Sequence, residues 1–223
     1  EEKLDERISK EMENLLDDNF HAIQTINDRD FKEQEVPTQA SIKEAIDIFY
    51  IVNAAGVNLT DAELALAQIS GYWPQARDLF KRKLKKLSDN GFVFNLDFII
   101  YVLLGIIYNS GTKMERLHDI SNNDKIREVW EKLDDEILDY VFNIMKSQAF
   151  IDHTKEVNSI YSFIPIIVFV YHHGINNITQ TRIKKIIKWF YYSQIRYRYI
   201  SQLQQKLDKD LKIIVNEENP FDV

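Results

Sequence analysis

The stretch LDFIIYVLLGIIY, residues 96–108, is apolar on nearly every side of a helical projection. A helix that is apolar all round belongs in the interior of a protein rather than on its surface. A second apolar run covers residues 160–172 and ends before Gly174, and Pro165 is expected to break or kink it. Both runs are shorter than the roughly 20 residues that a membrane-spanning helix needs. The sequence therefore predicts two buried helices in a globular protein.

Most of the remaining chain carries apolar side chains at helical spacing, which predicts amphipathic helices. The expected helices cover residues 3–26, 41–52, 60–69, 74–90, 123–148, 179–194 and 203–214. Two capping boxes, Ser41 with Glu44 and Thr60 with Glu63, mark helix starts, because hydroxyl and carboxylate each accept a free backbone N–H. The predicted fold is an all-α bundle of about nine helices, with at most one short strand near residues 31–36.

Composition and charge divide the chain into two parts. Residues 1–36 hold 12 acidic and 5 basic side chains, and the whole chain of 223 residues has a net charge of −7. We therefore expect an acidic N-terminal helix and a possible last core strand over residues 1–36, and a helical domain over residues 37–223. The chain has no cysteine and an acidic first segment, EEKLDER, unlike the basic start of a signal peptide. These features predict a cytoplasmic protein.

The stretch FYIVNAAGVNLTDAEL, residues 49–64, places a tight loop between two expected helices. Gly56 would supply a positive φ if the turn requires one. On local physics the loop is a helix-turn-helix corner, and it could also form one wall of a site. The spacing of Asn53, Gly56, Thr60 and Glu63 resembles a motif of the GmrSD-type family, the ParB-like nuclease domain proteins of bacterial restriction systems.

Two later segments resemble the same family in the same order. The segment FIPIIVFVYHHG, residues 163–174, is similar to its apolar helix followed by Gly, and residues 188–214 are similar to its Trp–Arg-Tyr helix followed by a helix carrying an Asp. The resemblance covers roughly residues 30–215. It implies the helical C-terminal part of a restriction or anti-phage protein that cleaves nucleotides or DNA.

The chain departs from the family at its catalytic motif. The string Asp-Gly-Gln-Gln-Arg does not occur, and Ile51 stands where the family has Arg. The resemblance then implies that this chain has no catalytic residues and is inactive alone, and that its partner is a missing ParB-like core. A nucleoside triphosphate and a divalent metal would belong to the full-length protein. Four loop residues would face that core: Asn53, Gly56, Thr60 and Glu63.

A basic, aromatic segment near the C-terminus is the candidate nucleic-acid-binding region. Residues 182–212 hold 9 basic and 2 acidic side chains, so this segment carries +7 on an acidic chain. A basic helix face with aromatic rings can hold phosphates and stack bases. The other interpretation is an amphipathic helix whose Tyr and Trp side chains pack in the core. The candidate residues are Arg182, Lys184, Lys185, Lys188, Tyr192, Arg196 and Arg198.

The remaining charged groups indicate solvent-exposed helix faces rather than a catalytic or metal-binding site. The basic residues of 81–86 and the acidic run 134–136 both read as solvated helix faces. Each close His–carboxylate pair offers two ligands at most, so no metal site and no cofactor are expected in this chain. The alternative function is a non-enzymatic helical module that binds a protein partner or DNA, with no membrane involvement.

Overall fold

The structure is a computed structural model, and it describes residues 10–30, 33, 35–41, 44–45, 47–48, 51–52, 60–111, 117, 123–217 and 220–222. These residues form helices and turns, which confirms the all-α prediction. Of the expected strand, Glu33, Glu35 and Val36 are described, and they adopt no regular structure. The chain separates into two compact units, residues 1–39 and residues 40–223.

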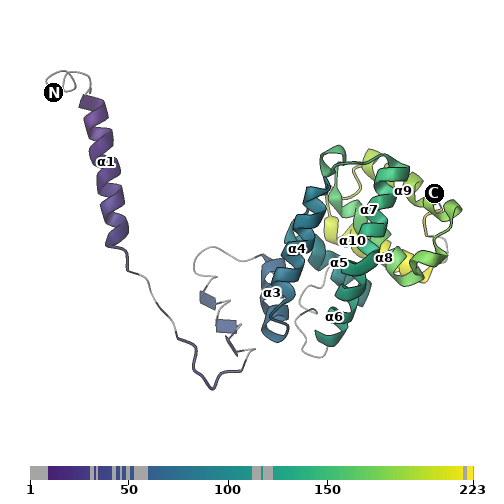
Figure 1. Cartoon of the computed structure of the whole chain (residues 1–223), viewed down its shortest axis with the longest axis horizontal. Helices are drawn as coiled ribbons and strands as arrows, with labels where there is room; N and C mark the ends of the chain where they lie inside the picture. The colour runs from purple at the N-terminus through teal and green to yellow at the C-terminus, as the bar shows by residue number, and fades with distance from the viewer. Residues whose placement is uncertain are drawn as a thin grey trace. The chain divides into compact units, whose positions relative to one another are not determined.

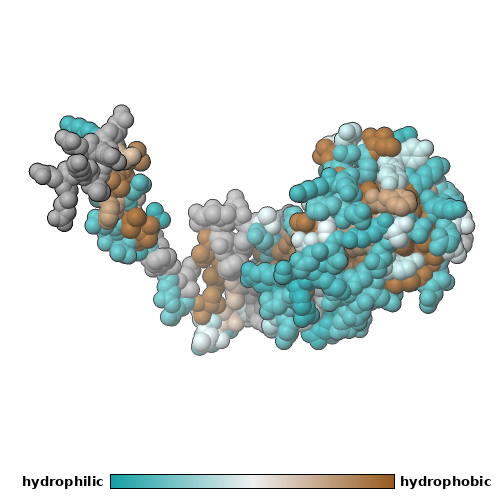
Figure 2. Space-filling view, turned by 45° about the horizontal axis from the view of Figure 1, so that its top comes forward, coloured by the Kyte–Doolittle hydropathy of each residue, from teal (hydrophilic) through white to brown (hydrophobic). Residues whose placement is uncertain are grey.

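The described residues of the first unit form one helix, α1 (Lys10–Asn27). Its apolar side chains repeat at helical spacing and lie on the surface of the unit, where they are 46–66% exposed (Figure 2). They are Met12, Leu15, Leu16, Phe20, Ile23 and Ile26. The unit therefore presents an amphipathic helix whose apolar stripe is uncovered.

The second unit is a bundle of helices (Figure 1). Residues of the expected helix 41–52 are helical wherever they are described beyond Ser41. The later helices are α3 (Asp61–Tyr72), α4 (Ala76–Asp89), α5 (Leu96–Tyr108), α6 (Asn123–Lys132), α7 (Leu138–Ala149), α8 (Phe163–His173), α9 (Gln180–Ile195) and α10 (Leu203–Asn216). A π-helix, Leu133–Ile137, joins α6 to α7, so the helix expected over residues 123–148 is continuous but changes its hydrogen-bond pattern in the middle. Among the described residues, no helix combines the length and apolar character required to cross a bilayer.

The two apolar runs form the packed centre of this bundle. Helix α5 contacts α3, α4, α6 and α8, and α8 also packs against α7 and α10. Gly105 lets α5 and α8 approach closely, because a Cβ atom there would lie 2.9 Å from Cγ2 of Val168. Residues 160–162 form a 3₁₀ turn before α8 begins, so Pro165 lies in the first helical turn, where its missing N–H removes no internal hydrogen bond. The expected break in the helix therefore lies before Pro165, where the 3₁₀ turn meets α8.

Both predicted capping boxes are formed. The Thr60 hydroxyl accepts from the Glu63 N–H at 3.1 Å, and the Glu63 carboxylate accepts from the Thr60 N–H at 2.9 Å. The corresponding distances for Ser41 and Glu44 are 3.2 and 2.8 Å. These caps begin the helices before and after the loop. The loop itself, residues 53–59, lies outside the described residues, and it contains the predicted site residues Asn53 and Gly56.

Candidate nucleic-acid interface

Helix α9 begins where the sequence predicts, and its apolar side is buried. Thr179 caps it by accepting from the Arg182 N–H at 3.3 Å. Ile183, Ile186 and Phe190 are buried, and the Phe190 ring stacks on Phe163 of α8 at 5.1 Å. This burial fixes the rotation of α9, so its polar side faces solvent.

Four side chains form a continuous exposed row on α9 and its C-cap. Lys184, Lys188, Tyr192 and Arg196 recur at every fourth position and are all exposed. We call this row the α9 ridge, and a helical rise of about 1.5 Å per residue gives it a length of about 18 Å. The Lys188 ammonium and the Arg196 guanidinium each lie 5.8 Å from the centre of the Tyr192 ring. The ridge therefore combines three cations with one aromatic ring.

Two of the predicted cations have local partners instead. Nη1 of Arg182 donates to the Asn177 carbonyl at 3.0 Å, and its guanidinium lies over the Phe169 ring. Lys185 forms an ion pair with Asp222 at 2.5 Å. Both side chains are only partly exposed, so they add less to the cationic surface than the ridge does.

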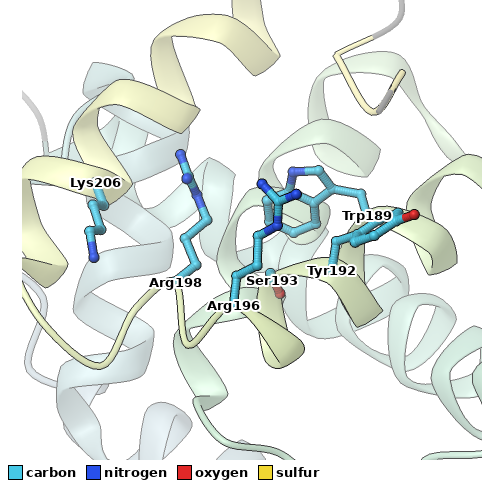
Figure 3. A pocket seen from close by; sticks show the side chains of 6 residues that line it. All are labelled: Trp189, Tyr192, Ser193, Arg196, Arg198 and Lys206. Carbon is cyan, nitrogen blue, oxygen red and sulfur yellow. The ribbon is translucent and has the colours of Figure 1, made fainter.

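A pocket opens at the C-terminal end of the ridge (Figure 3). It has a volume of about 350 Å³. Arg196 and Arg198 point in the same direction, the two aromatic rings lie on the side of Arg196, and Lys206 of α10 lies on the other side of Arg198 (Figure 3). Its lining residues are Trp189, Tyr192, Ser193, Arg196, Arg198 and Lys206. The structure thus gathers Tyr192, Arg196 and Arg198 of the predicted residues, and it adds Lys206, which sequence spacing on α9 could not reveal.

The turn after α9 aims both arginines at the pocket. Tyr197 adopts the left-handed conformation with φ 50°, its N–H donates to Gln194, and the Arg198 N–H donates to Ser193. This pair of bonds is a Schellman motif, which closes a helix and reverses the chain. Such a turn usually carries Gly, so the strain of a tyrosine there is offset by the surrounding contacts.

Arg198 is held in place by a buried carboxylate. Its Nε donates to Asp210 at 2.6 Å, its Nη2 donates to the other carboxylate oxygen, and the Tyr199 hydroxyl also donates to Asp210. The hydrogen bonds to Asp210 raise the pKa of Arg198 above its usual range. Burial, together with the negative charge of Asp210, raises the pKa of Tyr199 well above its ordinary value. Arg198 is thus a fixed, charge-compensated donor at the edge of the pocket.

The other two cations at the pocket are uncompensated. Within the described chain, neither Arg196 nor Lys206 forms an ion pair, and Lys206 donates only to the Ser201 hydroxyl at 3.3 Å. Since Arg198 and Asp210 cancel, the pocket has a net charge of about +2. Such a pocket favours an anion next to an aromatic surface.

Lys83 forms a second charged cluster, and the expectation of a solvated basic face is wrong for this residue, whereas the other basic residues of 81–86 are exposed. Its side chain is only 1% exposed, and its Nζ lies 3.1 Å from Asp134 and 3.0 Å from Asp139. It also donates to the Asp134 carbonyl of the π-helix at 2.5 Å. Burial opposes ionisation of Asp139, but hydrogen bonds from Lys86 and Lys83 outweigh it and lower the pKa of that carboxyl. Lys83 thus donates one hydrogen bond and lies within ion-pair distance of two carboxylates, so this cluster holds α4 against the π-helix and the start of α7.

The remaining predicted site residues have structural roles where they are described. Thr60 and Glu63 are exposed and bonded to each other in the capping box. No group of three or more potential metal ligands occurs among the described side chains.

No family model, curated protein or solved structure matches this chain. The fold and the site define a class, an all-α helical domain with a cationic, aromatic pocket at the end of a basic ridge. The GmrSD-type resemblance stays a prediction.

Proposed function

We propose that this chain is the helical portion of a GmrSD-like restriction or anti-phage protein and that it supplies a surface for nucleic-acid phosphates. The observation that carries the binding role is the α9 ridge with its pocket. Lys184, Arg196 and Lys206 have no acidic partner in the described chain, although the protein as a whole carries a net charge of −7. Cations without an acidic partner attract phosphates, because binding releases condensed counterions.

In this proposal, the catalytic residues belong to a ParB-like core. The core would supply the Asp-Gly-Gln-Gln-Arg motif, with the nucleoside triphosphate and a divalent metal, and the loop containing Asn53 and Gly56 would face it. The present chain alone is then inactive on nucleoside triphosphates and on DNA. Metal-dependent turnover by the purified chain, abolished by a point mutation within it, would contradict this assignment.

The binding role is tested by salt titration. We expect weak binding to a 12-base-pair DNA duplex, with little sequence preference and a steep loss of affinity as salt is added. Replacing both ridge lysines, Lys184→Gln with Lys188→Gln, should reduce the slope of log affinity against log salt by up to about 1.8, at about 0.9 per phosphate contact.

A matched control is present on α4. Lys81 and Lys85 are exposed lysines outside the ridge, and Lys81→Gln with Lys85→Gln makes the same change of net charge. This control should leave the slope unchanged. Equal effects of the two double variants would show that the ridge is not the binding surface, and absence of binding by the unmodified protein would reject the binding role.

A second candidate function follows from α1. Its uncovered apolar stripe favours a non-enzymatic module that binds a protein partner. Under that function the chain would not bind nucleic acid, whereas Phe20→Ser in α1 would abolish association with the partner.

A further inference from the structure

We propose that the pocket at the end of the α9 ridge binds one unpaired nucleotide, with its base against the aromatic side and its phosphate among the cations. This inference rests on the proposed function, because it states which form of nucleic acid the α9 ridge and its pocket bind. It goes further by predicting a preference for single-stranded over duplex nucleic acid.

The aromatic side of the pocket is open to a ligand. Tyr192 is 41% exposed, so a ligand can reach its side chain beside the Lys188 and Arg196 cations, which lie 5.8 Å from its ring centre. Trp189 lies next to it, and its position is supported by the Phe221 ring at 5.3 Å in an edge-to-face arrangement. Every base has a π face, so stacking on such rings is tolerant of sequence.

The cationic side lies within reach of the same ligand. Arg198 uses Nε and Nη2 for Asp210, which leaves its Nη1 group directed away from that carboxylate. A guanidinium has five N–H donors, so one already held by a carboxylate can still donate to a phosphate. Arg196 and Lys206 add positive charge from the C-cap of α9 and from α10 (Figure 3). The site is therefore built from α9, the turn that follows it and α10, and is not the exposed face of one helix.

The size of the pocket and the cost of unstacking favour an unpaired base over a paired one. A volume of about 350 Å³ lies at the small end of ligand pockets, with room for one nucleotide. A base inside a duplex is stacked on both faces and must be unstacked before it can meet a ring. An unpaired base has no such cost, whether it belongs to a free nucleotide or to a single strand.

Fluorescence anisotropy with labelled dT12 and with a 12-base-pair duplex, at one salt concentration, tests the inference. We expect dT12 to bind at least about fivefold more tightly than the duplex. Tyr192→Ala should weaken dT12 binding by at least about fivefold, the lower end of the effect of losing one stacked base. Tyr192→Phe keeps the ring and should retain the affinity.

Matched variants exclude general effects of charge and apolar surface. Arg196→Gln should weaken dT12 binding strongly, whereas Arg82→Gln, the same change at an exposed position of α4, should change it less than about twofold. Phe150→Ala removes a ring that is 80% exposed but does not line the pocket, and it should have no effect. Equal losses from pocket and control variants would overturn the inference.

Competition separates the two sources of the nucleotide. If dTMP displaces dT12 and inorganic phosphate at the same concentration does not, the base is part of the recognition. A dTMP affinity equal to that of dT12 assigns the pocket to free nucleotides, and a much weaker one assigns it to single strands. Equal competition by phosphate would reduce the pocket to an anion site and reject the inference.

The failure of this inference can be distinguished from that of the proposed function. Equal affinity for dT12 and duplex, unchanged by Tyr192→Ala, would reject the nucleotide pocket and leave the phosphate-binding ridge in place. Absence of binding to both would reject both.

Discussion

The buried ammonium group of Lys83 donates to the Asp134 carbonyl and forms ion pairs with the carboxylates of Asp134 and Asp139. A buried charge is costly unless it is paired, and here Asp134 and Asp139 supply both the charge and the hydrogen bonds. In the Arg198–Asp210–Tyr199 group, the buried Asp210 carboxylate accepts three hydrogen bonds, two from Arg198 and one from Tyr199. At the scale of single residues, these two clusters carry the strongest polar constraints on the fold.

Replacing Lys83 by Met should lower the free energy of unfolding by about 1–3 kcal/mol, because the Asp134 carbonyl loses a buried partner and two carboxylates lose a cation. Urea denaturation measures this loss. Lys86→Met is the control, because Lys86 binds the same Asp139 from an exposed position and should leave the midpoint nearly unchanged. A larger effect at Lys86 would contradict the structural role of Lys83.

Tyr199 should make stability sensitive to alkaline pH. Its folded pKa is raised above the ordinary value near 10, so its contribution is complete below pH ~10 and is lost as the pH rises toward the folded pKa. Unfolding of Tyr199→Phe should therefore be less pH-dependent above pH ~10 than that of the unmodified protein. At neutral pH the variant should be less stable by about 1–3 kcal/mol. Identical alkaline profiles would contradict this prediction.

At the scale of elements, turns with left-handed residues decide where helices stop and where side chains point. Tyr197 places Arg196 and Arg198 at one pocket, and Gly91 closes α4 with φ 93°. A Cβ atom on Gly91 would lie 2.2 Å from the Asp152 carbonyl oxygen. This glycine therefore allows the α4–α5 turn to lie against the segment after α7.

Gly91→Ala should cost at least about 2 kcal/mol of unfolding free energy, since backbone strain and a steric clash act together. Gly174→Ala is an informative control, because φ is also positive there, at 76°, but no atom lies within 4 Å of the new Cβ position. It should cost only the backbone part, about 1–3 kcal/mol for a conformation with φ 76° and ψ 144°. Thermal unfolding of both variants gives the comparison, and equal losses would show that the contact with Asp152 is unimportant.

At the scale of the whole molecule, the described core begins at Ala62 and ends at Phe221. The apolar side chains of α1 belong to the other unit and are exposed on it. The stability of the bundle should therefore be independent of α1, while the stripe on α1 remains available to a partner.

Leu16→Ser with Phe20→Ser should leave the main thermal transition unchanged. Ile100→Ala in the centre of α5 is the contrast, and it should lower the free energy of unfolding by about 2–5 kcal/mol. Differential scanning calorimetry distinguishes the two. A fall in the melting temperature of the α1 variant would mean that the stripe is covered in solution.

The sequence by itself determined the helices and many of their ends. Thr60 with Glu63 and Thr179 act on N–H groups three residues away, so a short window of sequence contains the whole interaction. The burial of α5 was also predictable, because a helix that is apolar all round leaves no side suited to water.

Only the tertiary structure decided which charged residues meet. The pairing of Lys83 with Asp134, the π-helix that offers its carbonyl, and the entry of Lys206 beside Arg196 all join different helices of the chain. Helical spacing places Lys83 in a basic run, but burial depends on a partner more than 50 residues away. The physical reason is that caps and apolar stripes are properties of one segment, whereas a buried ion pair and a pocket exist only after several segments have packed together.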